Sequence, residues 1–506
     1  MLPLLSGVLL VLCQPPVSLF FLAYVALVPL LFALRKGNQG HNFLAGLAAG
    51  VVSYGGLVYW VTVAMNSFGG ISMPLSLLTL LLLVLYLALF TGCFTWLVSL
   101  LDDCQRIPPS LSAPLVWVLL EYLRGLLLSG FPWSLLAHSQ YNFLPIVQVV
   151  SVTGTYFLSF LIVAANCLVY AVLSKKRIPP VYGPAVLCLF AACLVFGVHR
   201  LREPITATMG TSIVQGNIRQ DIKFDEAYKE HILRTYSDLT LAHSRPSDLV
   251  IWPETAMPFV FLQDGASVAV RALPAALSNY LLLGTISRDG RGRYYNTAYV
   301  IGKGGEISGS YSKNHLVPFG EYTPLAAYFP FLQDISVATG DFFPGPSHDP
   351  VATGIGKIGV LICYEGIFPS ITSDTVRRGA EVLVNITNDA WFGRTSAPYQ
   401  HFACYIFRAV ETDRYLLRAA NTGISAIIDP RGREAGRTAL FKEEVLRGTF
   451  APRQGQTIYV RYGDYFVFLA FLLLCGLVLK GIYSARPDKA HERRGTPSIP
   501  SSRRSP

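Results

Sequence analysis

The sequence is poor in charged residues. Asp, Glu, Lys and Arg together make up 14% of its 506 residues, whereas hydrophobic residues make up 52%. The mean hydropathy is +0.44. In typical soluble domains about a quarter of the residues are charged, so this composition excludes a wholly water-soluble enzyme and predicts a polytopic membrane protein. The chain is nevertheless long enough to include a soluble domain as well.

The sequence also lacks the patterns of a metal site and of a nucleic-acid surface. Its nine cysteines include no CxxC pair and no Cys/His spacing typical of zinc, and we expect neither a metal nor a cofactor. The net charge is +10, but the basic residues form short clusters beside apolar segments. That distribution is typical of membrane topology rather than of phosphate binding, so we expect no nucleic-acid partner.

Eight apolar segments are long enough to cross or enter a bilayer. They lie at about 1–13, 17–34, 43–66, 72–101, 110–129, 146–174, 181–198 and 464–483. The break at Pro15-Pro16 predicts a tight helical hairpin between the first two. The first segment has no basic residues before it, so we interpret it as a retained helix and not as a signal peptide. We predict eight crossings, with six or seven as alternatives: a bundle of about seven helices over 1–200 and a final helix at 464–483.

The charges of the connecting loops predict the orientation. With eight crossings, Arg35-Lys36, Arg106, Lys175–Arg177 and the basic tail fall on one side, and the loops of the other side contain no Lys or Arg. By the positive-inside rule the basic side is cytoplasmic. Both termini are then inside, and a domain over 205–455 lies outside the cytoplasm. The Ser-, Pro- and Arg-rich residues 485–506 are predicted to be disordered.

Two ionisable residues interrupt one of the apolar segments. Glu121 and Arg124 are three residues apart, so on a helix they share a face and can pair. One interpretation is a structural pair that positions the next loop. The other is contact with a lipid substrate, because ionisable residues at such depth commonly have a role. Trp133 follows at the outer interface and is a candidate for the same contact.

Residues 205–455 have the pattern of a layered α/β domain. Amphipathic stretches at 225–243 and 401–414 lie among short β-rich runs, and such alternation is typical of strands and helices in layers. The Gly304-Gly305 turn predicts a hairpin and hence a mixed sheet. The predicted strands are 210–214, 249–252, 280–284, 297–301, 359–363, 382–386 and 424–428.

Three polar residues follow apolar runs of this domain and could form a thiol-based site. Cys363 follows the apolar run at 358–362, Glu254 follows Trp252-Pro253, and Lys313 lies near the end of another apolar run, after Tyr311-Ser312. A thiol nucleophile needs a base and a positive charge for the oxyanion, and Glu254 and Lys313 supply these. We expect each to end a different strand of one sheet. The alternatives for Cys363 are a buried apolar role or a disulfide with Cys404, and a disulfide would silence it.

The same residues resemble a known family. Trp252–Thr255 and Cys363–Glu365 are similar to the Glu, Lys, Cys order of the nitrilase (carbon–nitrogen hydrolase) superfamily. The longer match Lys313–Pro324 (KNHLVPFGEYTP) resembles its membrane-bound branch, the apolipoprotein N-acyltransferases. The resemblance covers the chain up to about 485 and implies an αββα sandwich outside the membrane. Further matching segments are Val214–Ile218, Asn388–Gly393 and Gly130–Trp133.

The resemblance implies transfer of an acyl chain from a membrane phospholipid to the α-amino group of an S-diacylglyceryl-cysteine apolipoprotein. We expect a monomer in the bacterial inner membrane, with its catalytic domain in the periplasm. In this family Glu254 is the base, Lys313 holds the oxyanion and Cys363 forms a thioester. The supporting residues are Glu321, Tyr364 and Glu365, whose alternative roles are a surface carboxylate, a packed aromatic and a structural carboxylate, respectively.

Several aromatic residues are candidate substrate contacts. The family often has Trp where this chain has Phe224, so any hydrogen bond from an indole at that position is lost. We also expect the apolar segments Tyr328–Leu332 and Phe342–Pro344, including Phe343, to form a hydrophobic rim. His315 and His401 are not expected to act as bases, because Glu254 fills that role.

Two other functions fit the same residues. A membrane-tethered amidase or nitrilase would use the same triad with water as the acceptor, although anchoring alone needs only one helix. A transporter or scaffold would carry a degenerate form of the domain. The first alternative differs from acyl transfer to a lipoprotein in its acceptor, which is water. The second alternative differs because activity would not require Cys363.

Overall fold

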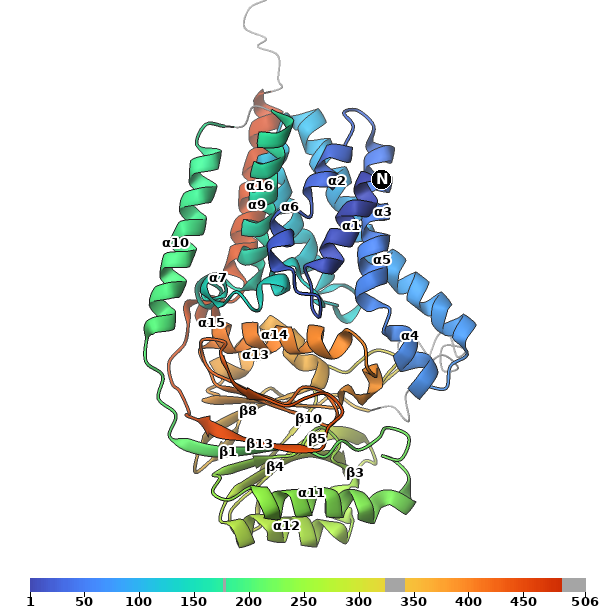
Figure 1. Ribbon diagram of the computed structural model, residues 1–506, viewed down its shortest axis with the longest axis vertical. Helices are drawn as coiled ribbons and strands as arrows, with labels where there is room; N and C mark the ends of the chain where they lie inside the picture. The colour runs from blue at the N-terminus through green and yellow to red at the C-terminus, as the bar shows by residue number, and fades with distance from the viewer. Residues whose placement is uncertain (176–178, 324–341, 485–506) are drawn as a thin grey trace, which may run out of the picture.

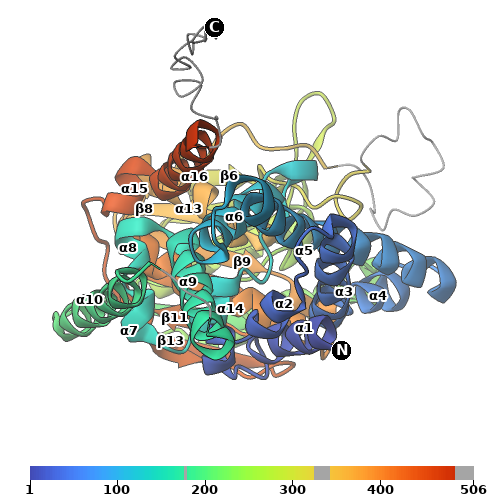
Figure 2. The same ribbon diagram turned by 90° about the horizontal axis from the view of Figure 1, so that it is seen from above.

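The structure is a computed structural model that describes residues 1–175, 179–323 and 342–484. It has two stacked parts, a helical bundle and a β-rich domain beneath it (Figure 1). The chain passes from the bundle to the domain through helix α10 (Tyr182–Arg202) and returns through α16 (Tyr465–Ser484). Seen from above, α10 lies at one side of the bundle and α4 (Val61–Val63) at the other (Figure 2).

Each of the eight predicted apolar segments contains helix. By length and composition five helices are able to cross a membrane within the described ranges: α3, α5, α9, α10 and α16. The others are shorter, such as α6, which has 16 residues and contains Pro114. The remaining bounds are α1 Leu2–Leu12, α2 Val28–Ala33, α3 Gln39–Val58, α5 Met73–Gln105, α6 Pro109–Arg124, α7 Leu144–Val147, α8 Val150–Thr153 and α9 Thr155–Ser174, with short helices η1 Phe20–Tyr24, η2 Ala64–Phe68, η3 Leu127–Ser129 and η4 Leu136–Gln140.

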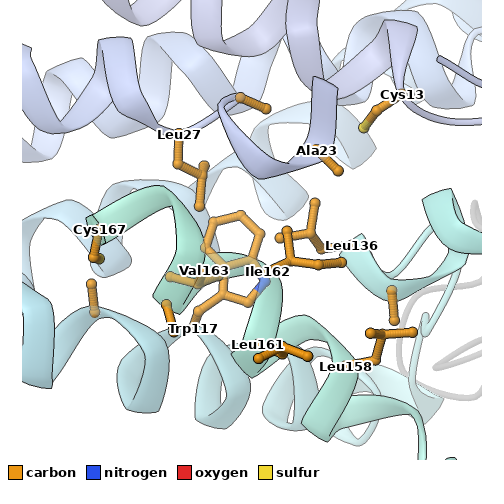
Figure 3. Close-up of a cluster of buried hydrophobic side chains, with 14 of the residues drawn as sticks. Cys13, Ala23, Leu27, Trp117, Leu136, Leu158, Leu161, Ile162, Val163 and Cys167 are labelled. Carbon is orange, nitrogen blue, oxygen red and sulfur yellow. The ribbon is translucent and has the colours of Figure 1, made fainter. Parts of the chain in front are cut away.

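The core of the bundle forms where the N-terminal hairpin packs on α6 and α9 (Figure 3). Leu27, between η1 and α2, lies in this cluster with Trp117 of α6 and Ile162 of α9. The helical structure is interrupted between η1 and α2, which leaves main-chain groups without helical hydrogen bonds. The Asn166 side chain of α9 replaces two of these bonds: it accepts from Leu27 N and donates to the Ala23 carbonyl, both at 2.8 Å. A buried side-chain amide can replace lost helical hydrogen bonds in this way.

The predicted basic loops gather at one end of the bundle. The turn between α2 and α3 is tied to the end of α5, because Gly37 N and the Gln39 amide both donate to Asp103, at 2.8 and 2.9 Å. The end of α9, the start of α10 and the end of α16 lie at this same end, away from the β-rich domain (Figure 1). The clusters at 35–36 and at 106 are therefore close together.

Glu121 and Arg124 bind the loop that follows their helix, and no ion pair joins their side chains. The Glu121 carboxylate accepts from Leu136 N at 2.8 Å, and the Arg124 guanidinium donates to the Trp133 carbonyl at 3.2 Å. Arg124 also lies over the Tyr54 ring, 5.3 Å from its centre. These contacts agree with the interpretation in which the two residues position the next loop.

The β-rich domain contains two mixed sheets. One has the order β13-β1-β2-β4-β5-β6 with β3 beside β4, and the other has the order β12-β11-β10-β9-β8-β7. The predicted hairpin is present, because β5 and β6 pair antiparallel across Gly304-Gly305. The strands are β1 Met209–Gln215, β2 Leu249–Ile251, β3 Met257–Val260, β4 Tyr280–Arg288, β5 Tyr294–Ile301, β6 Ile307–Ser312, β7 Val351–Thr353, β8 Gly356–Ile362, β9 Val382–Thr387, β10 Leu416–Ala420, β11 Ala426–Ile428, β12 Glu434–Arg437 and β13 Glu444–Phe450.

Helices cover the outer faces of both sheets, so the layer order is α-β-β-α, as expected. Apolar residues such as Ile251 and Val360 fill the space between the sheets. Helices α11 (Lys229–His243) and α12 (Ala266–Leu277) cover the first sheet, and α13 (Pro369–Arg377) and α14 (Ala397–Thr412) cover the second. Figure 1 shows the α13 and α14 layer facing the bundle. The short helices here are η5 Glu226–Tyr228, η6 Phe261–Gln263, η8 Cys363–Ile367, η9 Asp389–Phe392 and α15 Ile458–Tyr462.

Candidate active site

The three predicted residues converge at one edge of the sandwich, but they do not come from one sheet. Glu254 follows β2 and Lys313 follows β6 of the first sheet, whereas Cys363 follows β8 of the second. The one-sheet expectation was wrong, because spacing along the chain does not distinguish two strands of one sheet from strands in two stacked sheets. Face-to-face packing brings the strand ends together.

Cys363 has an unusual main-chain conformation. Its φ is +52°, a left-handed value that costs a non-glycine residue about 1–3 kcal/mol. The surroundings hold this turn: the Tyr405 hydroxyl donates to the Cys363 carbonyl at 2.8 Å, and Glu365 accepts from Ile362 N at 2.7 Å. The sulfur is therefore placed at the sharp change from strand β8 to helix η8. The thiol is free, as is that of Cys404.

Glu254 is fixed through both of its carboxylate oxygens. One oxygen accepts from the Asn296 amide at 2.8 Å, and the other accepts from Asn388 N at 2.8 Å. Its main-chain carbonyl accepts from the Lys223 ammonium at 3.0 Å. Strand β4 approaches closely here: a Cβ on Gly284 would lie 2.7 Å from Glu254 Cα. The orientation of this carboxylate is therefore set by several neighbouring strands.

Lys313 is buried between two carboxylates. It is 1% exposed, and its Nζ lies 2.7 Å from Glu321 and 3.9 Å from Glu254. Glu321 also accepts from the Asn296 amide at 2.9 Å and from Val317 N at 2.9 Å. Burial alone would lower the pKa of Lys313, but the two carboxylates and Cys363 raise it above its ordinary value. The ammonium is therefore charged at neutral pH.

The thiol of Cys363 is protonated at rest. Burial and then the negative charge of Glu254 raise its pKa, and the positive charge of Lys313 opposes this only in part. A thiol of this kind reacts when a base removes its proton during attack. Glu254 and Lys313, which influence the thiol in opposite directions, are of the right charge to take that proton and to hold a developing oxyanion.

Glu365 and Tyr364 connect the nucleophile's turn to its surroundings. Glu365 is fully buried and accepts from Asn314 N at 2.7 Å and from the Tyr311 hydroxyl at 2.9 Å. It thereby joins the turn of Cys363 to the segment after Lys313. The Tyr364 hydroxyl donates to the carbonyl of Gly130, in the loop after α6, at 2.9 Å. One residue thus links the two strand ends, and the other links the site to the bundle.

Sequence reasoning missed several residues of the site. Asn296 bridges Glu254 and Glu321, and Tyr405 holds the main chain of Cys363. Asn388 was noted only as part of a matching segment, and Lys223 was not noted at all. None lies at the end of an apolar run except Asn388, after β9. That position at a strand end was the one signal available.

Comparison with known proteins identifies the family. Residues 6–168 match the apolipoprotein N-acyltransferase N-terminal domain, and residues 210–458 match the carbon–nitrogen hydrolase family. An apolipoprotein N-acyltransferase of Geobacter metallireducens is 40% identical over 97% of this chain and 96% of its own length. That of Azotobacter vinelandii is 34% identical over 95% of each chain.

The chain belongs to the apolipoprotein N-acyltransferase family. It is therefore an acyltransferase with a nitrilase-superfamily domain, and its long apolar helices are those of a membrane protein. Among solved structures, Nit3 of Saccharomyces cerevisiae, a nitrilase-superfamily member, matches with a TM-score of 0.39 and 19% identity. That match covers 49% of this chain and 92% of Nit3.

In this member of the apolipoprotein N-acyltransferase family, the candidate substrate contacts lie in different settings. Phe224 and Phe343 are 46% and 41% exposed, and Phe342 is partly buried with its N–H bonded to the Glu321 carbonyl at 2.9 Å. Trp133 is 2% exposed, and its indole donates to Gln400 at 2.7 Å. Trp133 is thus packed between the bundle and α14. The predicted rim segment 328–332 lies outside the described residues.

The two histidines near the site have structural contacts. His401 hydrogen-bonds Asp389 at 3.0 Å and the Tyr405 hydroxyl at 3.0 Å. His315 packs on Phe368, 4.2 Å between ring centres, and burial together with Lys313 lowers the pKa of His315 to about 4. In this member of the apolipoprotein N-acyltransferase family, His401 thus supports Tyr405, which in turn holds the main chain of Cys363.

Proposed function

We propose that this protein transfers a fatty acyl chain from a membrane phospholipid to the α-amino group of S-diacylglyceryl-cysteine apolipoproteins through a thioester on Cys363. The observation that carries the proposal is the convergence of Glu254 and Lys313 on the partly buried thiol of Cys363, in the domain that an apolar bundle covers. The names of its relatives supply the acceptor.

In the first half-reaction, Glu254 takes the thiol proton as the Cys363 sulfur attacks the ester carbonyl carbon. The carbonyl oxygen becomes an oxyanion, which the Lys313 ammonium stabilises. The ester C–O bond then breaks, and the protonated Glu254 gives its proton to the leaving oxygen. A thioester and a lysophospholipid result. Glu321 supports this step, since its ion pair at 2.7 Å holds Lys313 and leaves Glu254 as the more distant carboxylate.

In the second half-reaction, the α-amino nitrogen of the apolipoprotein attacks the thioester carbonyl carbon. Glu254 accepts a proton from the amine, Lys313 again faces the oxyanion, and the C–S bond breaks. The proton passes from Glu254 to the sulfur, which restores the resting thiol. The sequence is a ping-pong reaction in which one site serves both substrates.

The proposed location follows from the substrates. A phospholipid donor requires the nucleophile to lie near a bilayer, and the α13 and α14 layer faces the bundle (Figure 1). With the basic loops in the cytoplasm, the domain over 205–455 is periplasmic and the protein is a multi-pass component of the bacterial inner membrane. The proposal treats the protein as a monomer.

Mass spectrometry of the purified protein after incubation with phospholipid tests the first step. We expect an acyl adduct on Cys363 that hydroxylamine removes, and no adduct on that position in Cys363→Ala. The matched control is Cys104→Ala, which removes an exposed thiol and should leave the adduct unchanged. An unmodified Cys363 in the wild-type protein would contradict the mechanism.

Addition of a diacylglyceryl peptide tests the second step. The expected product is an N-acylated peptide, formed as the adduct disappears. Release of free fatty acid alone would instead indicate hydrolysis, as in a tethered amidase. Full activity of Cys363→Ala in cells would indicate a scaffold or transporter with a degenerate domain.

A further inference from the structure

Lys223 is a fully buried lysine beside the proposed base. It lies in the segment between β1 and η5, is 1% exposed, and donates to the Glu254 carbonyl at 3.0 Å. The next residue, Phe224, is 46% exposed. Lysine is almost never fully buried without a partner, because removal of its charge from water is costly. The burial of Lys223 therefore calls for an explanation.

The ammonium of Lys223 has unused hydrogen-bonding capacity. It carries three N–H donors, and within the described ranges its one hydrogen bond is the bond to Glu254. No carboxylate of those ranges forms an ion pair with it, in contrast to Lys313 and Glu321 at 2.7 Å. A buried cation in this state is suited to a negative charge that develops during the reaction.

The charges that face Lys223 are those of the reaction itself. Burial lowers the pKa of Lys223 to about 8, and the negative charge of Glu254 opposes that shift, as does the Cys363 thiolate once it forms. The Lys313 ammonium lies 3.9 Å from the Glu254 carboxylate. At pH 7 Lys223 is therefore mostly protonated, and it loses its positive charge as the pH rises through about 8. Lys313 keeps its charge over the same range because its pKa is raised.

We propose that Lys223 is a positioning residue for acyl transfer. Its hydrogen bond holds the main chain of Glu254 where Thr255 takes a positive φ of 50°, and its ammonium favours the anionic states of Cys363 and of the bound ester. Lys313, which is paired with Glu321, and Lys223, which has no carboxylate partner among the described residues, would then both stabilise negative charge at the Cys363 sulfur. This inference rests on the proposed function, since it assumes that Cys363 takes up the acyl chain.

The test compares the full-length wild-type protein with Lys223→Met, which keeps the size of the side chain but removes its charge. The rate of acyl-adduct formation on Cys363 is measured in phospholipid micelles from pH 6.5 to 9.5, a range centred near the pKa of about 8. We expect the wild-type rate to fall above about pH 8. At pH 7 Lys223→Met should be about 10- to 100-fold slower, with no fall on the alkaline side. Lys442→Met, at an exposed lysine, is the matched control.

Three outcomes would overturn the inference. They are a wild-type rate with no fall up to pH 9.5, a Lys223→Met protein with the wild-type rate, and a slower variant that keeps the alkaline fall. If Lys223→Met does not fold, the pH dependence of the wild-type rate is sufficient to test the inference. An adduct on Cys363 that is unaffected by Lys223→Met rejects only this inference, whereas the absence of any adduct on wild-type Cys363 rejects the proposed function as well.

Discussion

Glu321 and Glu254 lie on either side of the Lys313 ammonium and share the amide of Asn296. The Lys313 Nζ lies 2.7 Å from Glu321 and 3.9 Å from Glu254, so the two carboxylates differ in how closely they pair with the lysine. Glu321 is the nearer partner that neutralises the lysine, and Glu254, the proposed base, is the more distant one. At the scale of single residues, the roles of chemically identical side chains thus follow from their separation from one buried cation.

Loss of Glu321 should destabilise the protein as well as inactivate it. Glu321→Ala leaves the Lys313 ammonium buried without its nearest partner, and breaking such a pair costs about 3–5 kcal/mol. Thermal unfolding in detergent should therefore occur at a clearly lower temperature. Glu443→Ala, at an exposed carboxylate, should unfold as the wild type does. Equal melting temperatures for both variants would show that the buried pair is not needed.

Glu254→Gln should change thiol reactivity and acyl transfer in opposite directions. After burial, the Glu254 charge is the largest influence that raises the pKa of Cys363, so its removal lowers that pKa and increases the thiolate fraction. Alkylation of Cys363 by iodoacetamide at pH 8, followed by peptide mass spectrometry, should become faster. Acyl-adduct formation should fall by about 10²–10⁴-fold because the base is lost. A parallel loss of both would indicate a misfolded site.

At the scale of elements, the site depends on the close approach of strands to the turn that carries the base. Gly284 lies in the middle of β4, and a Cβ at that position would be 2.6 Å from the Pro253 carbonyl oxygen. The Pro253 carbonyl oxygen and the nearby Glu254 Cα are both main-chain atoms, so the main chain itself must shift to make room. A side chain at this point would therefore displace the turn that carries Glu254.

Gly284→Ala should displace Glu254 and reduce acyl-adduct formation by at least about 10-fold, since a shift of about 1 Å can cost 100-fold in rate. The measurement is adduct formation on Cys363 at pH 7, with the melting temperature recorded in parallel. Gly290→Ala is the matched control on the turn after the same strand, where an added Cβ meets nothing within 4 Å. Equal rates in the two variants would contradict this explanation.

Much of this arrangement could be predicted from the sequence. The apolar runs predicted strands β1, β2, β4, β5, β8, β9 and β11 to within a few residues, because buried strands are continuously apolar. Strands such as β12, with exposed polar residues, have no such pattern. The ends of runs located Glu254, Lys313 and Cys363. Lys223, Asn296 and Tyr405 were missed, since only contacts across the fold distinguish them from ordinary polar or core residues.

At the scale of the whole molecule, the second sheet is covered by helices that the bundle then covers in turn. Residues of α14, such as Phe407 and Val410, belong to the same apolar cluster as the N-terminal hairpin. Trp133 and Trp60 from the bundle both donate to Gln400 of α14. The domain and the bundle therefore share one continuous interior on this side.

Phe343→Asp should impair use of a membrane donor more than folding. The ring is exposed near the site, with the Arg293 guanidinium 5.4 Å from its centre, and we expect it to contact acyl chains. Adduct formation from phospholipid vesicles should fall about 10-fold, whereas a water-soluble short-chain thioester should still load Cys363 at the wild-type rate. Tyr228→Asp, at an exposed aromatic residue on the domain, is the control. Equal losses with both donors would contradict a role in lipid capture.

The bond between the Tyr364 hydroxyl and the Gly130 carbonyl also sets a height. The loop of Gly130 follows α6 directly, and Glu121 and Arg124 of that helix anchor the loop. With the bundle in a bilayer, these contacts hold Cys363, the proposed nucleophile, at a fixed height relative to the lipid surface. We therefore expect the protein to act on substrates whose reacting group extends from the bilayer to the height of Cys363, because the domain need not move toward the membrane. The distance between a substrate's membrane anchor and its reacting group would then contribute to specificity.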